Sequence, residues 1–121
     1  MTNSYPRSCM EVMQLGVKHN GVYTIEPQPG KRVKTYCNLQ TDLGGWTLLT
    51  NVVSRVGWSL ETVKERSSYD PLNSDFSIFG LVDVLKDPSR VEVSLGFHNL
   101  VNGPRNLANQ YGIFVKKRVF V

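Results

Sequence analysis

The chain has 121 residues, of which 40% are hydrophobic and 20% are charged. This length fits one domain, and the composition is that of a globular protein, not of a collagen, a coiled coil or a disordered tail. No apolar run approaches the roughly 18 residues that cross a bilayer, and residues 1–7 lack the apolar core of a secretory signal. We therefore predict neither a membrane span nor a signal peptide in this sequence.

The charge is moderately basic, with 14 Lys and Arg against 10 Asp and Glu, a formal net charge of +4. The basic residues come in short groups, at residues 31–34 and 116–118, and do not form one long stripe. Such a surface favours anionic partners without defining one, and nucleic acid is not predicted as a partner.

The two cysteines, Cys9 and Cys37, stand 28 positions apart. They form no C-x-x-C pair and have no histidine at metal-ligand spacing, so we predict no zinc site. They are either two unrelated thiols or a bridge between an opening helix and a hairpin. A bridge would stabilise the fold by roughly 3.5 kcal/mol in the chain-entropy model and would indicate an oxidising compartment.

The first predicted elements are a short helix and a hairpin. Ser8 and Glu11 fit a capping box at the start of the helix, and Gly16 is placed to end it. Two alternating stretches, residues 22–26 and 32–37, flank the Pro- and Gly-containing turn 27–30. This pattern predicts a β-hairpin.

The middle of the chain begins with a turn at residues 42–45. The run 46–53 is rich in β-branched and aromatic residues and predicts a buried strand. Ser59 can cap a short helix over Leu60–Lys64. Residues 70–73 predict a surface loop.

The last third predicts one helix and two strands. Apolar residues at helical spacing from Ser77 to Leu85 predict a helix, and strict alternation over residues 90–97 predicts a strand. The run 111–121 is strand-like and carries two apolar clusters split by the basic residues 116–118. If this strand lacks a neighbour, its unpaired edge predicts self-association, which the basic residues oppose.

Candidate catalytic and metal-binding residues are few. His19, His98 and Cys9 have no motif around them, so we interpret them as structural or surface residues and predict no catalytic site and no cofactor. Asp70, Asn73 and Asp75 supply oxygen atoms, but the twelve-residue calcium loop is absent. We therefore predict that these three residues cap a turn and that no metal binds tightly.

The two tryptophans receive different interpretations. Trp46 begins the predicted central strand, so we expect it in the core. Trp58 stands among polar residues and is the candidate for a ligand-binding surface.

Four stretches resemble the start of a fibrinogen-like (fibrinogen C-terminal) domain. These are Ser8-Cys9-Met10-Glu11, Gly21-Val22-Tyr23-Thr24-Ile25, Tyr36-Cys37-Asn38-Leu39 and Gly44-Gly45-Trp46-Thr47. They are similar to the Cys-led helix, the G-x-Y-x-I strand, the Y-C-D-M strand and the G-G-W-T motif of that family. The match is dense over residues 9–49 and looser beyond, and Asn38 stands where the family usually has Asp.

The resemblance has several implications. It implies that Cys9 and Cys37 form the first disulfide of the family and that the protein is extracellular. It also implies truncation, because family domains run to roughly twice this length and carry their calcium loop, second disulfide and ligand pocket in the C-terminal part. No ligand residue of the family can therefore be assigned to a position of this chain.

These observations together predict an α+β fold, a truncated fibrinogen-like domain. A short disulfide-tied N-terminal helix and hairpin precede a mostly antiparallel sheet with one or two further helices. We divide the single domain 1–121 into a flexible lead (1–7), an N-terminal subdomain (8–53) and the start of a central sheet subdomain (54–121). The predicted function is non-catalytic extracellular recognition of a glycan or protein partner within a larger or multimeric assembly. A structural, matrix or self-assembly module is the alternative, and an enzyme is disfavoured.

Overall fold

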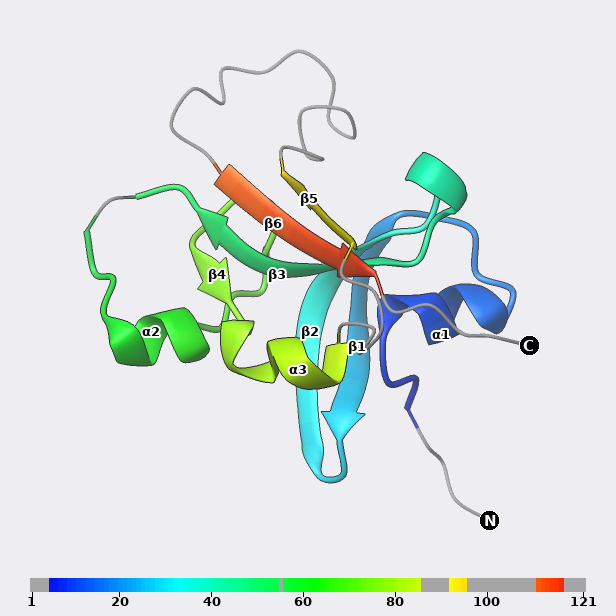
Figure 1. Cartoon of the computed structure of the whole chain (residues 1–121), viewed down its shortest axis with the longest axis horizontal. Coiled ribbons are helices and arrows are strands. Elements are labelled where there is room, and N and C mark those ends of the chain that lie inside the picture. The colour runs from blue at the N-terminus through cyan, green and yellow to red at the C-terminus, as the bar shows by residue number, and fades with distance from the viewer. Residues whose placement is uncertain (1–4, 55, 86–91, 96–110, 117–121) are drawn as a thin grey trace.

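The computed structural model describes residues 5–54, 56–85, 92–95 and 111–116, and its centre is an antiparallel sheet (Figure 1). The strands follow the order β1-β2-β3-β6-β5, and β4 also pairs with β3. The strands are β1 Gly21–Gln28, β2 Lys31–Asn38, β3 Trp46–Val52, β4 Phe76–Ser77, β5 Glu92–Leu95 and β6 Tyr111–Lys116. The helical elements are α1 Cys9–Gln14, η1 Thr41–Leu43, α2 Leu60–Lys64, η2 Phe79–Leu81 and α3 Val82–Leu85. The predicted α+β class is confirmed.

The N-terminal helix α1 is fixed to the sheet by a disulfide and a hydrogen bond. Cys9 and Cys37 are bonded, which confirms the predicted bridge between the helix and the hairpin. The Cys9 amide also donates to Thr47 Oγ1 of β3 at 3.1 Å. The predicted capping box is wrong, because the Ser8 side chain makes no cap bond and the Glu11 carboxylate accepts from the Arg7 amide, one residue earlier than expected.

The hairpin of β1 and β2 forms as predicted but with a tighter turn. Gln28 pairs with Lys31, so Pro29 and Gly30 alone make the turn, and Gly30 has φ +81°. Pro27 lies within β1, which is an edge strand, where the missing amide of proline is tolerated.

Residues 5–7, which we assigned to a lead segment, contact this hairpin. The Glu26 amide of β1 donates to the Pro6 carbonyl at 2.8 Å. The Arg32 guanidinium of β2 lies 4.1 Å from the centre of the Tyr5 ring. The lead segment is therefore attached to the hairpin from Tyr5 onward.

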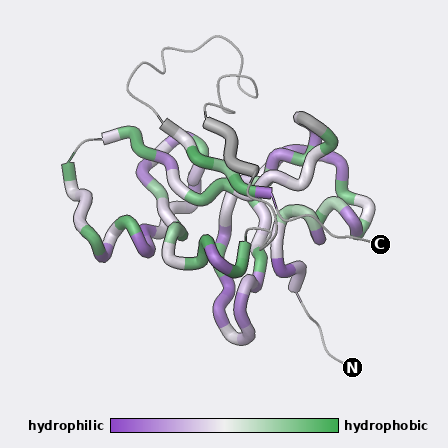
Figure 2. Tube along the Cα trace, viewed as in Figure 1, coloured by the Kyte–Doolittle hydropathy of each residue, from purple (hydrophilic) through white to green (hydrophobic). Residues whose placement is uncertain are grey.

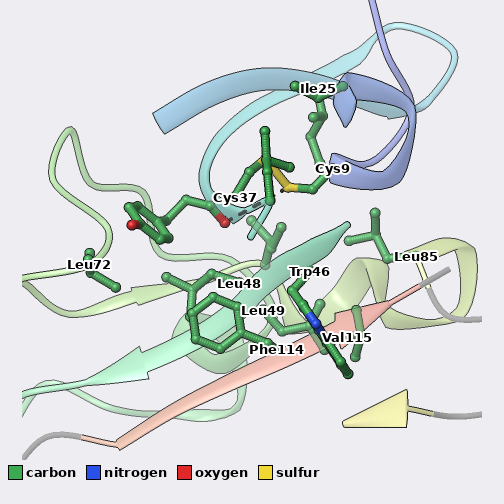
Figure 3. Close-up of a cluster of buried hydrophobic side chains, with 14 of the residues drawn as sticks. Cys9, Ile25, Cys37, Trp46, Leu48, Leu49, Leu72, Leu85, Phe114 and Val115 are labelled. Carbon is green, nitrogen blue, oxygen red and sulfur yellow. Dashed lines mark hydrogen bonds between the residues drawn. A yellow bond between two sulfur atoms is a disulfide. The ribbon is translucent and has the colours of Figure 1, made fainter. Parts of the chain in front are cut away.

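The core lies along β3, whose first six residues are all buried, as predicted (Figure 3). Trp46 is 5% exposed, and its indole nitrogen donates to the Thr41 carbonyl at 3.0 Å. Phe114 of β6 and Leu85 of α3 pack into the same cluster and are fully buried. Figure 2 shows the hydrophobic residues along β3 and β6, whereas the projecting end of the hairpin is hydrophilic.

One edge of β3 is shared by two strands that diverge from each other. β6 pairs with β3 from Trp46 to Val52 and takes one edge. β2 pairs with the other edge at Trp46 and Thr47, and β4 pairs there at Thr50 and Asn51. The register shift between Leu48 and Thr50 is a bulge, which bends a strand locally. We call the opening between β2 and β4 the fork.

Two carbonyl groups at the base of the fork are satisfied by its two arms. The Thr35 hydroxyl of β2 donates to the Leu48 carbonyl at 2.7 Å. The Ile78 amide, just after β4, donates to the Leu49 carbonyl, also at 2.7 Å. Both arms are thus hydrogen-bonded to the bulged part of β3.

The short helix α2 begins where we predicted, but the next predicted helix starts late. Ser59 and Thr62 form a capping box at the start of α2. The helix expected from Ser77 begins only at Phe79 as a 3-10 turn and continues as α3. Ser77 is instead a strand residue, because its amide and carbonyl pair with Arg66 at 2.9 and 2.7 Å.

The predicted surface loop at residues 70–73 is partly buried, which corrects that expectation. Leu72 is only 5% exposed and belongs to the core cluster. Buried Asn51 of β3 holds this loop, because its Nδ2 lies 3.0 Å from the carbonyl oxygens of Pro71, Leu72 and Ser74. The loop therefore closes over the core.

The C-terminal strand β6 is an interior strand over the part that the structure describes. It pairs with β3 on one side and with β5 on the other, so the unpaired edge from which we predicted self-association is not found over Tyr111–Lys116. Lys116 is buried, and its Nζ lies 5.2 Å from the centre of the Trp46 ring, so it does not act as an exposed gatekeeper. Residues 117–121 lie outside the described residues, and self-association stays a prediction.

In the described ranges, no helix combines the length and the apolar character needed to pass through a membrane.

Candidate functional site

The fork opens into a groove made of two adjoining hollows of about 300 and 150 Å³. The larger hollow lies against residues 32–34 of β2, residues 67–69 and the segment 76–78 around β4. The smaller hollow lies toward Lys31, Lys64 and Leu81. Val33, Glu65 and Ile78 line both. We call the two hollows together the fork groove.

The fork groove runs along the edge of β2. Consecutive side chains of a strand point to opposite faces of the sheet. Arg32, Val33 and Lys34 are consecutive, and all three line the larger hollow. A single hollow can contact both faces only at the strand edge. β2 pairs with β3 only at Cys37 and Asn38, so residues 31–34 lie outside that ladder.

The walls of the groove combine apolar and hydroxyl-bearing side chains. Phe76 and Ile78 are buried, and half-buried Val33 packs against the same core. Ser67, Ser68 and Tyr69 form another wall. Tyr69 is 95% exposed, so its ring is available to a partner in solution.

Positive charge predominates around the groove. The lining contains one carboxylate, Glu65, and four cationic side chains, which are Lys31, Arg32, Lys34 and Lys64. Lys31 Nζ lies 2.8 Å from Glu65 Oε1, and this ion pair joins β2 to the segment after α2. Arg32 Nε lies 2.8 Å from Glu26 Oε1. In the part of the chain that the structure describes, Lys34 has no ion pair within 4.0 Å.

Two titratable groups near the hairpin have shifted pKa values with structural causes. The hydrogen bond from Arg32, together with the Gly30 amide, lowers the pKa of the Glu26 carboxyl. Burial raises the pKa of Tyr36 to about 12, although a hydrogen bond with Asn20 opposes this shift. Glu26 is therefore charged and Tyr36 neutral at physiological pH, so neither is tuned for acid–base chemistry.

Trp58, the candidate from the sequence, lies outside the fork groove. Its indole nitrogen donates to the Ser54 carbonyl at 2.8 Å, and the Arg66 guanidinium lies 4.7 Å from the centre of the ring. Arg66 also donates to the Gly57 carbonyl and pairs with Asp75. Trp58 thus has a structural part in the loop before α2, and its binding of a ligand stays a prediction.

The oxygen-rich residues of the 70–75 loop have separate partners. Asp70 accepts from the Asn73 side chain, whereas Asp75 accepts from the amides of Val53 and Ser54. In the described ranges, no three His, Cys, Asp or Glu side chains come together as a metal-binding group. These residues support turns, as the sequence indicates.

His19 and the two cysteines are also apart from the groove. His19 is exposed, and its carbonyl accepts a 2.6 Å hydrogen bond from the Tyr23 hydroxyl. Cys9 is fully buried in its disulfide, so it is no free nucleophile. His98 lies outside the described residues.

The fork groove was missed by the sequence analysis. The basic group at residues 31–34 was visible, and an alternating strand was predicted there. The opposite wall comes from residues 64–69 and 76–81, thirty or more positions away, and no local pattern shows that β2 and β4 share an edge of β3.

Comparisons with known proteins agree with the N-terminal motifs. The family model "Fibrinogen beta and gamma chains, C-terminal globular domain" matches residues 5–72, more than half of the chain. Fibrinogen-like protein A of Apostichopus parvimensis is 32% identical over 79 residues, covering 60% of this chain and 27% of that protein. Mouse angiopoietin-4 is 46% identical over 44 residues, covering 36% of this chain and 9% of its own length.

A solved structure shows the same fold. The fibrinogen-like globe domain of human ANGPTL6 matches with a TM-score of 0.51 and 17% identity, covering 76% of this chain and 50% of that chain. The chain thus spans about a quarter or less of these two curated relatives and half of this solved domain. The matched segment includes the disulfide, the hairpin and the Gly-Gly-Trp turn. The protein therefore belongs to the family of the C-terminal globular domain of fibrinogen beta and gamma chains, whose members are binding or structural proteins and not enzymes.

Proposed function

We propose that the chain is an extracellular recognition module that binds a glycan or protein partner as part of a larger or multimeric assembly. The observation that carries this proposal is the fork groove, which combines an apolar wall, hydroxyl groups and an excess of positive charge. A ligand-binding site is usually an apolar hollow with a small number of polar groups that point into it.

The extracellular location is supported by the disulfide and by the relatives. Structural disulfides persist in oxidising compartments, and Cys9 and Cys37 are bonded. Angiopoietin-2 and the beta subunit of fibrinogen are among the relatives. Detection of the Cys9–Cys37 bridge in natively produced protein, by mass measurement with and without reductant, tests this part.

A binding screen with a groove variant tests recognition. The full chain is immobilised and exposed to a panel of glycans and of extracellular proteins. Tyr69→Ala removes an exposed ring at the groove, whereas Leu15→Ala removes a 73% exposed side chain on α1's C-terminal side and serves as the control. We expect a ligand whose binding is lost with Tyr69→Ala and kept with Leu15→Ala.

Two other outcomes separate the alternatives. A protein that binds nothing in either panel, yet associates with itself in light scattering, supports the structural or self-assembly alternative. A ligand that is lost in a Trp58→Leu variant, but kept in Tyr69→Ala, places recognition at the loop before α2. Either outcome contradicts recognition at the fork groove.

A further inference from the structure

We propose that the fork groove takes an extended acidic peptide segment of a partner protein, which adds to the edge of β2 as a further strand. This inference rests on the proposed function and names the chemistry of the partner. An edge whose N–H and C=O groups lie outside a ladder is a template for such strand addition.

The edge of β2 has room for this addition, whereas the facing strand does not. Residues 31–34 border the groove outside the β2–β3 ladder. On the opposite wall, Ser77 of β4 already pairs with Arg66 through two hydrogen bonds. An incoming backbone is therefore expected to pair with β2.

The apolar part of the groove accommodates alternate side chains of an added strand. Alternate residues of a strand point to the same face. Val33, Phe76 and Ile78 line the larger hollow, of about 300 Å³, where they would contact the side chains on one face of the added strand. An aliphatic side chain at every second position would bury its surface there, which stabilises binding.

The charges select an acidic segment. Lys34 has no ion pair within the described residues, and Lys64 adds a second cation at the smaller hollow. Carboxylates at the remaining alternate positions complement these charges. The basic stretch Lys116-Lys117-Arg118 of a second copy of this protein carries the same sign as the groove, which disfavours it as the occupant.

The Lys31–Glu65 ion pair provides a specific test of the preference for an acidic segment. Both side chains are partly exposed, at 39% and 58%, and they join the two walls. A ligand carboxylate that binds near Lys31 competes with Glu65 for this cation. Removal of the Glu65 carboxylate should therefore tighten binding, although it removes an interaction from the free protein.

The experiment uses the full chain and a labelled seven-residue peptide that alternates Val and Glu, with both ends blocked. Fluorescence anisotropy measures its dissociation constant. The controls are the same peptide with Lys in place of Glu and an acidic peptide whose pairing amides are N-methylated. We expect each control to bind at least about tenfold more weakly, because one has the wrong charge and the other cannot form the ladder.

Variants of the protein then locate the site. Lys34→Gln should weaken binding about fivefold, and Glu65→Gln should tighten it about threefold, in line with partly exposed charge contacts. Lys18→Gln, which removes an exposed lysine on the segment before β1, should change it by less than about twofold. Hydrogen exchange should show slower exchange of the amides of residues 31–34 when the acidic peptide is bound.

Three results would overturn the inference. They are equal binding of the N-methylated peptide, equal effects of Lys34→Gln and Lys18→Gln, or the absence of binding by the acidic peptide. If the peptide fails while a sulfated disaccharide or another ligand from the screen binds in a Tyr69-dependent way, strand addition is excluded and the proposed function stands.

Discussion

Helix α1, in the region 8–52, and helix α2, in the region 56–85, are held in place by different kinds of interaction. In the first region, α1 buries Cys9, Met10 and Val12 and is covalently bonded to β2. In the second region, α2 buries none of its residues. It is held by hydrogen bonds, which include the Ser59–Thr62 capping box and the bond from the Ser77 hydroxyl to the Val63 carbonyl.

This difference indicates how the two helices open. Apolar burial and a cross-link give cooperative stability that is lost only when the whole domain unfolds. Partly exposed hydrogen bonds can break one group at a time, so segments of this kind open locally at lower free energy. The fork groove lies between the two regions, with one wall from the hairpin and the other from a segment that includes Lys64 at the end of α2 and the buried residues Phe76 and Ile78.

The largest effect on stability is expected from removal of the Cys9–Cys37 disulfide. Cys9→Ala combined with Cys37→Ala should lower the free energy of unfolding by about 3.5 kcal/mol, because the unfolded chain regains the freedom of the closed loop. Urea denaturation measures the loss. A loss below about 1 kcal/mol would mean that apolar packing alone holds the first region.

The Gly-Gly turn before β3 provides the second test. Gly44 has φ +76° and ψ −173°, a conformation that is essentially restricted to glycine. A Cβ there would lie 2.3 Å from the Leu39 carbonyl oxygen. Gly44→Ala should therefore cost about 3 kcal/mol.

The matched control is Gly16→Ala. Gly16 also has a positive φ, but nothing lies within 4 Å of an added Cβ. Its cost should be about 1 kcal/mol, from backbone strain alone. Thermal unfolding of both variants measures the two losses of stability. Equal losses would contradict the close approach at Gly44.

Asn51 tests the connection between the two regions. Its amide lies 3.0 Å from three carbonyl oxygens of the 70–75 loop. Asn51→Ala leaves buried carbonyl groups without this donor and should cost about 2 kcal/mol. Hydrogen exchange should show faster exchange in residues 70–77, and unchanged exchange there would contradict the bridging role.

The smallest effect is expected at the capping box of α2. Ser59→Ala removes the side-chain acceptor of the Thr62 amide and should cost the helix about 1 kcal/mol. We expect faster exchange of the α2 amides with little change in the global melting temperature. Ser67→Ala is the control, because its hydroxyl has no hydrogen-bond partner among the described residues. A matching fall in global stability would show that α2 belongs to the cooperative core.

The sequence was most informative where a local pattern matched a local structure. The hairpin follows from the alternation of polar and apolar residues, the buried strand β3 from an apolar run, and the start of α2 from the cap residue Ser59. Each of these patterns spans only a short stretch of sequence. Ser77 shows where this fails, because its helical spacing was overruled by pairing with Arg66 and with Thr50 of β3. Leu72 was expected on the surface because loop residues surround it, but it packs into the core cluster and Asn51 of β3 donates a hydrogen bond to its carbonyl group.

The site depended on information that local patterns do not carry. The basic residues 31–34 looked like an ordinary solvated strand face. Their importance arises from a bulge in β3 and from the divergence of β2 and β4 along one edge. Pairing partners separated by tens of residues decide such an arrangement, and neither composition nor periodicity specifies them.

The pairing of β3 with β6 has a consequence for the order in which the protein folds. The hairpin joins residues 3 to 16 positions apart, from Gln28–Lys31 to Gly21–Cys37, whereas β3 and β6 join residues as far apart as Trp46 and Lys116. Closing a longer loop costs more entropy, and contacts of high sequence separation form slowly. During synthesis from the N-terminus, the hairpin and its disulfide partner are complete long before β6 emerges. Until then β3 has one open edge, so a nascent polypeptide that stalls before residue 111 leaves the strand along which the core lies without its β6 neighbour.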